Sequence, residues 1–275
     1  MANSLSHNFN QIWKQLTMSR SAKPIRTETG VSTADSITVY GKNLCTEVLG
    51  KVNLGDMGFL GLMGRLPTPQ ESVVFNAITV TLVEHGITPS AIVARQTILG
   101  APESLQGAVA AGLLGLGTVF VGSMDAVARM LTTALKDAGD KPNFNALAKI
   151  IVDDFSAKKT IIPGIGHPIH KPVDPRVPVL FRIAAENGFS GNYVKLMQAV
   201  HADAQSRTPK VLPMNATSAI GAIACELGID ARVVRGLGVM ARAVGLVSHI
   251  LEESRSPMAA EIWHRTEEDA TAHHR

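Results

Sequence analysis

The sequence predicts a mainly α-helical protein, and three observations carry that prediction. Apolar residues make up 45% of the chain and aromatic residues only 4%, a mix that suits closely packed helices better than a β-sandwich. The prolines of Thr68-Pro69, Thr88-Pro89 and Asp174-Pro175 stand where helices begin. Near the C-terminus, apolar residues recur at alternating spacings of four and three, as on one face of a helix: Val233, Leu237, Met240, Val244, Val247 and Leu251.

The N-terminal part is expected to contribute little regular structure. Residues 1–35 scatter Pro, Ser and Thr among charges, which predicts an arm or a loosely attached segment. Residues 36–41 read Ser-Ile-Thr-Val-Tyr-Gly and form the one strand-like stretch, with Gly41 as a turn signal. We therefore expect at most a short β element near residues 36–41.

From residue 68 onward the pattern is helical almost throughout. Thr68 caps a helix that Gly86 closes, and Thr88 opens the next one. The uncharged segment Ser104–Met124 is long enough to span a membrane, but its glycines and Gln106 favour a buried helix followed by a Gly-rich turn. Further helices are predicted over residues 125–136, 143–155, 192–207 and 233–251, and from residue 174 onward.

Composition narrows the partners. A net charge of +3 without a Lys/Arg-rich run argues against nucleic acid, and no membrane segment is expected. Cys45 and Cys225 have neither metal-type nor redox-type spacing, and such sparse cysteine is typical of a reducing compartment. No secretory signal is evident at the N-terminus, so we expect a cytoplasmic protein. We also expect that it needs no metal.

The densest group of polar residues lies between Lys158 and Arg176, around a Gly-rich turn that ends at His167. Glycines let backbone approach a ligand closely, and the exposed N–H groups of such a turn can bind anions. Arg176, beside a helix start, could hold a carboxylate through two hydrogen bonds. The alternative is a surface loop in which Asp174 merely caps a helix.

Four segments, in order along the chain, resemble those of the citrate synthase superfamily, and more closely its citryl-CoA lyases and the C-terminal part of ATP-citrate lyase. Residues 164–176 read Gly-Ile-Gly-His-Pro-Ile-His-Lys-Pro-Val-Asp-Pro-Arg, similar to the family's Gly-Phe-Gly-His…Asp-Pro-Arg. Residues 58–69 contain Gly-Arg-Leu-Pro, and residues 84–95 resemble Asp-His-Gly…Pro-Ser…Ala-Arg. Residues 242–253 resemble Arg-x-x-Gly-x-x-x-His-x-x-Glu.

The resemblance implies a citrate synthase-like helical fold with two domains. The large one would comprise residues 36–115 and 213–275, and the small one residues 116–212. It also implies a homodimer or higher homo-oligomer, in which a partner helps to complete each site. A CoA thioester would be the substrate, with no cofactor bound permanently.

Site residues follow from the same resemblance. His85 and His167 would hold the hydroxyl and carboxylates of the acyl part, and Arg176 and Arg242 would pair with carboxylates. The resemblance places the nucleotide end of CoA on the loop Pro163, Gly164, Ile165 and Gly166, with Lys158, Lys159 and Lys171 as phosphate candidates.

Two positions depart from the citrate synthase pattern. Phe120 stands where synthases have the histidine that stabilises the thioester enolate, and related lyases also carry Phe there, which favours a lyase over a synthase. Thr217, two residues after Asn215, stands where the family has the catalytic Asp. A threonine hydroxyl is no useful base near neutral pH unless another group activates it.

The sequence therefore predicts a citryl-CoA lyase-like enzyme, with His167, Asn215 and Thr217 at its catalytic centre and Phe120 lining the substrate pocket. It would cleave citryl-CoA, or a related 3-hydroxy-3-carboxyacyl-CoA, to acetyl-CoA and an oxo acid such as oxaloacetate. His167 would take the proton of the tertiary hydroxyl. Three explanations of Thr217 stay open: water or a neighbouring group replaces the Asp, the substrate differs, or C–C cleavage is lost. Condensation or thioester hydrolysis on a different acyl-CoA, or a non-catalytic CoA-ester-binding protein, are the alternatives.

Overall fold

The computed structural model describes residues 24–275, so residues 1–23 of the predicted arm lie outside it. The chain divides into two compact units, Met1–Val52 and Asn53–Arg275. Each is described by itself. The division into a large and a small domain stays a prediction.

The described part of the first unit contains a small antiparallel sheet of order β1-β2-β3. The expected strand is β2 (Ile37–Val39), which pairs with β1 (Gly30–Ser32) and β3 (Lys42–Asn43). The turn between β2 and β3 needs positive φ at Tyr40 and at Gly41, the residue read as a turn signal. β1 and β3 are too short for their side chains to alternate recognisably, which is why the sequence did not predict them.

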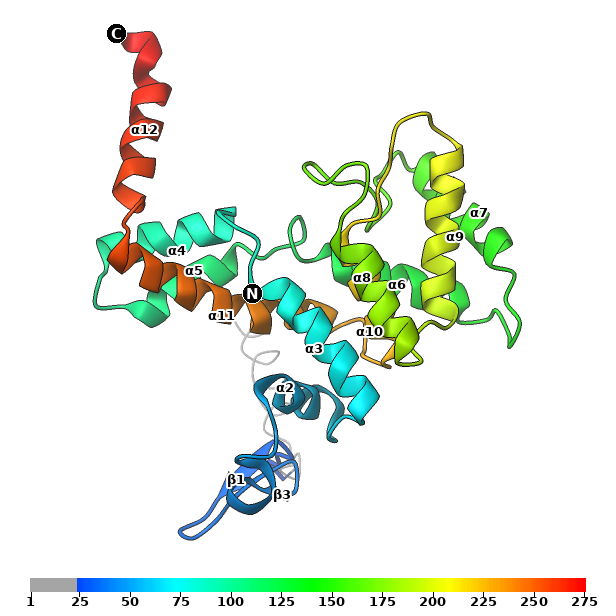
Figure 1. Ribbon diagram of the computed structural model, residues 1–275, viewed down its shortest axis with the longest axis horizontal. Helices are drawn as coiled ribbons and strands as arrows, with labels where there is room; N and C mark the ends of the chain where they lie inside the picture. Colours follow the sequence, from blue (N-terminus) through cyan, green and yellow to red (C-terminus); the bar gives the residue numbers. More distant parts are fainter. Residues whose placement is uncertain (1–23) are drawn as a thin grey trace, which may run out of the picture. The chain divides into compact units, whose positions relative to one another are not determined.

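The second unit is helical, in agreement with the predicted fold class (Figure 1). Its helices are α2 (Leu54–Met63), α3 (Pro69–Val83), α4 (Pro89–Gly100), α5 (Leu105–Leu114), α6 (Ser123–Leu135), α7 (Phe144–Ala157), α8 (Arg176–Glu186), α9 (Asn192–Ser206), α10 (Ala216–Glu226), α11 (Val234–Arg255) and α12 (Ala259–Thr271). A π-helical turn η1 (Leu44–Val48) belongs to the first unit, and a 3₁₀ turn η2 (Ala272–His274) follows α12.

The predicted helix starts are confirmed. Thr68 and Glu71 form a capping box at the start of α3, in which each side chain accepts from the other's backbone N–H. Arg65 also contacts Glu71, at 2.6 Å, and this hydrogen bond outweighs burial and lowers the pKa of the Glu71 carboxyl to about 2. The uncharged segment from Ser104 becomes α5, followed by turns over residues 115–122, as expected.

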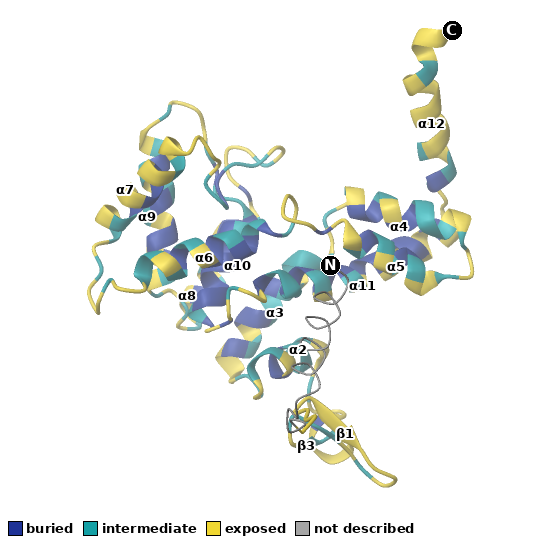
Figure 2. Ribbon diagram, turned by 180° about the vertical axis from the view of Figure 1, so that it is seen from behind, coloured by how far each residue is buried: buried dark blue, intermediate teal, exposed yellow. Residues whose placement is uncertain are grey.

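Helix α10 lies among α6, α8 and α9 and is buried along almost its whole length (Figure 2). Gly221 makes this close approach possible, because a Cβ there would lie 2.8 Å from two carbons of Val127 on α6. The first turn of α10 is thereby held against the rest of the helical core. That turn carries Asn215 at its N-cap and Thr217.

Helix α11 packs on α3, α4 and α5, while most of its apolar stripe is exposed. Leu237 is buried, whereas the other members of the stripe are 38–49% exposed: Val233, Met240, Val244, Val247 and Leu251. The inward face carries Arg242, His249 and small residues; a Cβ on Gly245 would lie 2.0 Å from the Val83 carbonyl oxygen. Close backbone contact and buried polar bonds therefore occupy the face of α11 that lies against the core.

Among the described residues, α11 alone is long and apolar enough to cross a membrane, judged by length and composition. Half of that stretch is buried against other helices. Buried Arg242 and His249 both lie on it. We therefore describe α11 as a core helix of the second unit.

Candidate active site

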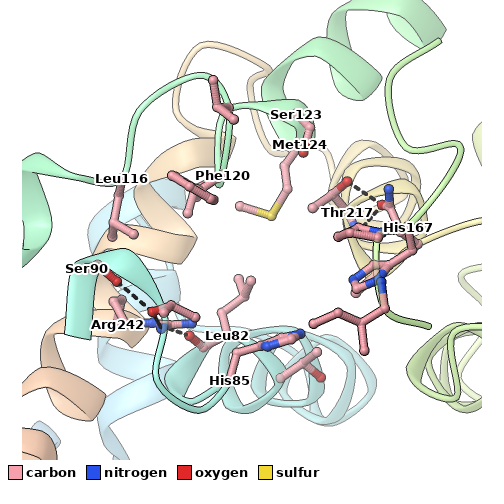
Figure 3. Close-up of a pocket in the computed structure, with 18 of the residues that line it drawn as sticks. Leu82, His85, Ser90, Leu116, Phe120, Ser123, Met124, His167, Thr217 and Arg242 are labelled. Carbon is pink, nitrogen blue, oxygen red and sulfur yellow. Dashed lines mark hydrogen bonds between the residues drawn. The ribbon is translucent and has the colours of Figure 1, made fainter. Parts of the chain in front are cut away.

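A cavity of about 590 Å³ opens between the end of α3, the turns before α6, the segment after Gly166 and the start of α10 (Figure 3). Its charged or titratable lining residues are His85, His167, Arg176 and Arg242, and no carboxylate of residues 24–275 lines it. The four predicted acyl-binding residues thus converge from three distant parts of the chain. Such a lining suits an anionic ligand.

His85 is the second residue after α3, at the rim of the cavity between Arg242 and His167 (Figure 3). The chain turns there through Gly86, whose φ is 74°. The carboxylate of Glu84 accepts hydrogen bonds from the backbone N–H groups of His85 at 2.8 Å and Gly86 at 2.6 Å. The position of His85 therefore depends on that carboxylate.

The hydrogen bonds of His167 determine which ring nitrogen carries its proton. Nδ1 accepts from the backbone N–H groups of Ile169 at 3.0 Å and His170 at 2.9 Å. A neutral ring therefore has its proton on Nε2, an assignment made from these bonds. Burial, followed by the positive charge of neighbouring groups such as His170, lowers the pKa of His167. When neutral, His167 is thus a donor through Nε2, which argues against the predicted role of accepting the hydroxyl proton.

Three imidazoles meet here: His85, His167 and His170 each offer a nitrogen within 4.8 Å of the others. A histidine that binds a metal normally donates its other N–H to an acceptor. His167 has the opposite arrangement, since its Nδ1 accepts two N–H bonds and its Nε2 holds the proton. The cluster therefore fits hydrogen bonding to an anionic oxygen better than metal ligation.

Arg242 is a buried cation that faces the cavity. Its side chain donates only at 3.3 Å, to the Leu82 carbonyl oxygen and the Thr88 hydroxyl. Within residues 24–275 no carboxylate lies in ion-pair contact with it. Burial lowers the pKa of Arg242, while the charge of Glu84 opposes that shift. A buried guanidinium without a paired anion fits the predicted role of binding a ligand carboxylate.

Arg176 is held differently from the expectation. Its Nε and Nη2 atoms both donate to Asp174, at 2.9 and 2.8 Å. Asp174 is fully buried and also accepts from the Ala216 N–H at 2.9 Å. Burial would raise the pKa of Asp174, but these bonds outweigh it and lower the pKa to about 2. Asp174 thus uses the Nε and one N–H of Nη2, and the edge formed by Nη1 and the second N–H of Nη2 remains for a ligand.

Thr217 reaches the cavity, but nothing nearby activates it as a base. Its hydroxyl donates to the Asn215 Oδ1 atom at 2.6 Å, and Asn215 Nδ2 donates to the Gly166 carbonyl at 2.8 Å. An amide oxygen cannot take a proton near neutral pH. The position of the family Asp therefore holds a hydroxyl whose proton is committed to a neighbour.

Phe120 lines the apolar side of the cavity, opposite His85 (Figure 3). It belongs to the turns before α6 and is 54% exposed. Leu116 and Met124 lie on the same side. Among residues 24–275, this side of the cavity carries no imidazole.

The Gly-rich loop is hydrogen-bonded to the segment before α10. Ile165 forms an isolated antiparallel bridge with Met214, and Gly166 donates to the Pro213 carbonyl at 2.7 Å. Gly164 has φ 80°, and a Cβ there would lie 2.6 Å from that of Ser218. The N–H groups of Ile165 and Gly166 are already bonded to backbone carbonyls, so these two are not free to bind an anion. CoA binding by Pro163–Gly166 stays a prediction.

Of the three lysines named as phosphate candidates, Lys171 alone lines a cavity. It borders a second hollow of about 400 Å³, which also includes Gly166, His167 and Lys210. Lys158 pairs with Asp154 on the surface of α7 at 2.7 Å. Lys158 and Lys159 line neither cavity.

Sequence reasoning missed Lys210, because only the fold brings it beside Lys171. It also missed the hydroxyls of Thr88 and Ser90, which lie 3.0 Å apart at the start of α4 and line the main cavity. The sequence could have indicated these hydroxyls, because both lie at the start of a helix that begins shortly after His85. Glu84 was quoted only as part of a motif, and its bonds to the next two residues could not be read from spacing.

The helical fold thus encloses a cavity that is cationic and, within residues 24–275, free of carboxylates, a lining that suits an anionic ligand. The family model described as the citrate synthase C-terminal domain matches residues 42–264. The chain belongs to the citrate synthase family, and the resemblance drawn from the four segments is confirmed.

The structure is similar to that of citryl-CoA lyase from Hydrogenobacter thermophilus, with a TM-score of 0.75, 31% identity, and coverage of 84% of this chain and 87% of that one. ATP citrate lyase from Methanothrix soehngenii, in complex with citrate and coenzyme A, gives a TM-score of 0.70 at 22% identity, over 89% of this chain and 41% of that one. A probable ATP-citrate synthase of Dictyostelium discoideum is 27% identical over 241 residues, 81% of this chain and 37% of that protein. The chain spans about a third of the length of the curated relatives it matches.

Proposed function

We propose that this protein cleaves citryl-CoA, or a related 3-hydroxy-3-carboxyacyl-CoA, into acetyl-CoA and an oxo acid. The observation that supports this most is the cavity lining: Arg176, Arg242, His85 and His167 converge, with no carboxylate among them. The acyl part of citryl-CoA carries two free carboxylates and a hydroxyl, so it needs this kind of lining. The similar ATP citrate lyase was solved with citrate and coenzyme A.

Arg242 would pair with one carboxylate of the acyl part, and the free Nη1/Nη2 edge of Arg176 with the other. Asp174 fixes the Arg176 guanidinium through two hydrogen bonds, so little orientation is lost when the substrate binds. Fixed cations of this kind place the reacting bond without reorganisation during the reaction.

Cleavage breaks the bond between the tertiary carbon and the CH₂ next to the thioester. The hydroxyl loses its proton and becomes the ketone of the oxo acid, while the bond's electron pair passes to the CH₂ carbon as the acetyl-CoA enolate. His85 would accept the hydroxyl proton, because its ring lines the cavity and makes no hydrogen bond within residues 24–275. His167 would donate a hydrogen bond from Nε2 to the oxygen of the same hydroxyl group.

The enolate carbon must then take a proton, and the cavity lining offers no carboxylic acid. A water molecule held by the oxygens of Thr217 and Asn215 would supply it, and the hydroxide that is left would take the proton that His85 accepted. The nucleotide end of CoA would lie over the second hollow, where Lys171 and Lys210 can meet phosphate.

Thr217 also favours a second candidate, a protein that binds the CoA ester without turning it over. Proton transfer by a positioned group contributes about 10²–10⁴-fold in rate, and here that group is a hydroxyl bonded to an amide. Condensation, or thioester hydrolysis on a different acyl-CoA, would use the same pocket and differ in products.

A homodimer is part of the proposal. Five apolar residues of α11 lie on one exposed face: Val233, Met240, Val244, Val247 and Leu251. A contiguous exposed apolar surface of this kind is typical of protein interfaces. A second copy of the chain would cover it.

The test is incubation of the purified protein with citryl-CoA, with released oxaloacetate followed through malate dehydrogenase. We expect oxaloacetate above an enzyme-free control, and a faster release from Thr217→Asp. Free CoA without oxaloacetate would indicate hydrolysis. Tight binding of citryl-CoA without any product would support the second candidate.

A further inference from the structure

His249 lies at the centre of a buried chain of hydrogen bonds behind the active site. It is 6% exposed on α11. Its Nδ1 atom faces the Arg95 guanidinium at 3.0 Å and 3.3 Å. Because arginine can only donate, Nδ1 is the acceptor, and the proton of a neutral ring is on Nε2.

That Nε2 proton points at Glu84. The Nε2 atom lies 3.1 Å from Oε1 and 3.0 Å from Oε2 of the carboxylate. The same Oε1 atom accepts from the N–H groups of His85 and Gly86. Burial would raise the pKa of Glu84, but the bonds from His85, His249 and Gly86 outweigh it and lower the pKa. Glu84 thus joins His249 to the turn that carries His85.

The chain continues away from the cavity. Arg95, which is fully buried, donates to Glu253 at 2.8 Å and also contacts Glu252. The other oxygen of Glu253 accepts from the N–H groups of Met258 at 2.9 Å and Ala259 at 2.8 Å, where α12 begins. A continuous set of bonds therefore runs from the first turn of α12 to the backbone of His85.

We propose that Glu84 and His249 are positioning residues for His85, fixed in turn by Arg95. None of the three lines the cavity. The His85 turn has little else to fix it, because Gly86 adopts a left-handed conformation and Glu84 is already non-helical. The chain of bonds supplies what local secondary structure does not.

The role of His85 in ligand binding rests on the proposed function, so the experiment has two separate readouts. Amide hydrogen exchange at His85 and Gly86, measured by NMR, reports the turn in the protein without ligand. Calorimetric titration with citrate reports the cavity. The variants are His249→Ala, which removes both bonds, and His249→Gln, whose amide keeps a donor for Glu84 and an acceptor for Arg95. Ser248→Ala, an exposed neighbour on α11, is the matched control.

We expect His249→Ala to raise the exchange rates of both amides about 10-fold and to weaken citrate binding about 10-fold. This magnitude corresponds to the loss of one charge-assisted hydrogen bond. His249→Gln should restore most of both effects, and Ser248→Ala should change neither. If His249→Ala does not fold, Glu84→Gln takes its place, because the Glu84 side chain is 45% exposed. Glu84→Gln should shift both readouts in the same direction.

Unchanged exchange at His85 and Gly86 in both His249→Ala and Glu84→Gln would overturn the inference. So would equal losses in His249→Ala and His249→Gln, because the bonds would then not be the cause. If citrate fails to bind the unmodified protein while the exchange rates still respond, the proposed function fails and the positioning inference stands.

Discussion

Replacing Arg242 by leucine should weaken the binding of citrate and leave the fold as stable as before. The two effects separate because Arg242 is buried with a charge that no carboxylate balances within residues 24–275. Its two hydrogen bonds are long, at 3.3 Å each. The folded protein without ligand therefore gains little from this side chain.

The magnitude follows from the buried setting. A hydrogen bond to a charged group contributes about 1.5–3 kcal/mol, which corresponds to roughly 10- to 100-fold in affinity. Replacing an unpaired buried charge by an apolar side chain of similar volume is often neutral or stabilising. We therefore expect citrate affinity to fall by about 10- to 100-fold, with a thermal midpoint that is unchanged or higher.

Isothermal titration calorimetry with citrate and a thermal unfolding scan test this together. Arg232→Leu is the control, because Arg232 is 85% exposed and pairs with Asp230 away from the cavity. Unchanged citrate affinity in the Arg242 variant would refute the reasoning. A lowered midpoint would refute it as well, since the arginine would then be part of the structural framework.

Three further predictions concern stability, CoA and assembly. The pKa of Asp174 is about 2 in the folded protein and about 3.9 in the unfolded chain. The ionised carboxylate therefore stabilises the fold fully above about pH 3.9, and this stabilisation is lost as the pH falls through about 2. Asp174→Asn should therefore lower the unfolding free energy at neutral pH by about 2–3 kcal/mol, and denaturant titrations should show the difference shrinking towards pH 2. The double variant Lys171→Glu/Lys210→Glu should weaken CoA binding by roughly 10-fold, whereas Lys158→Glu should not; equal effects in the two proteins would remove the second hollow as the phosphate site. Val244→Asp should convert a dimer into a monomer in sedimentation velocity, and an unchanged sedimentation coefficient would place the interface elsewhere.

The helical fold could be predicted because its signals are local. Thr68, Thr88 and the prolines after them mark helix starts through their own backbone chemistry, and α3 and α4 begin at those prolines. The orientation of α11 could not be predicted from its stripe. Which face is buried depends on Gly245 meeting Val83 and on His249 meeting Arg95, and these contacts join residues far apart in sequence.

The sequence predicted which candidate residues meet in the cavity, but it did not predict the hydrogen bonds that they make. His85, His167, Arg176 and Arg242 meet as the family resemblance implied. Their roles depend on hydrogen bonds that no motif encodes: backbone donors fix the proton of His167 on Nε2, and Asp174 occupies two atoms of Arg176. Lys210 has no sequence signal at all, because only the tertiary fold brings it to Lys171.

In the proposed reaction this cavity breaks a C–C bond of a citryl-type CoA ester, and solvent water protonates the enolate. Citryl-CoA incubated in D₂O with excess protein, followed by mass spectrometry of the products, tests it most directly. The account predicts oxaloacetate together with acetyl-CoA that carries one deuterium in its methyl group. Recovery of unchanged citryl-CoA, or of citrate and free CoA, would contradict it.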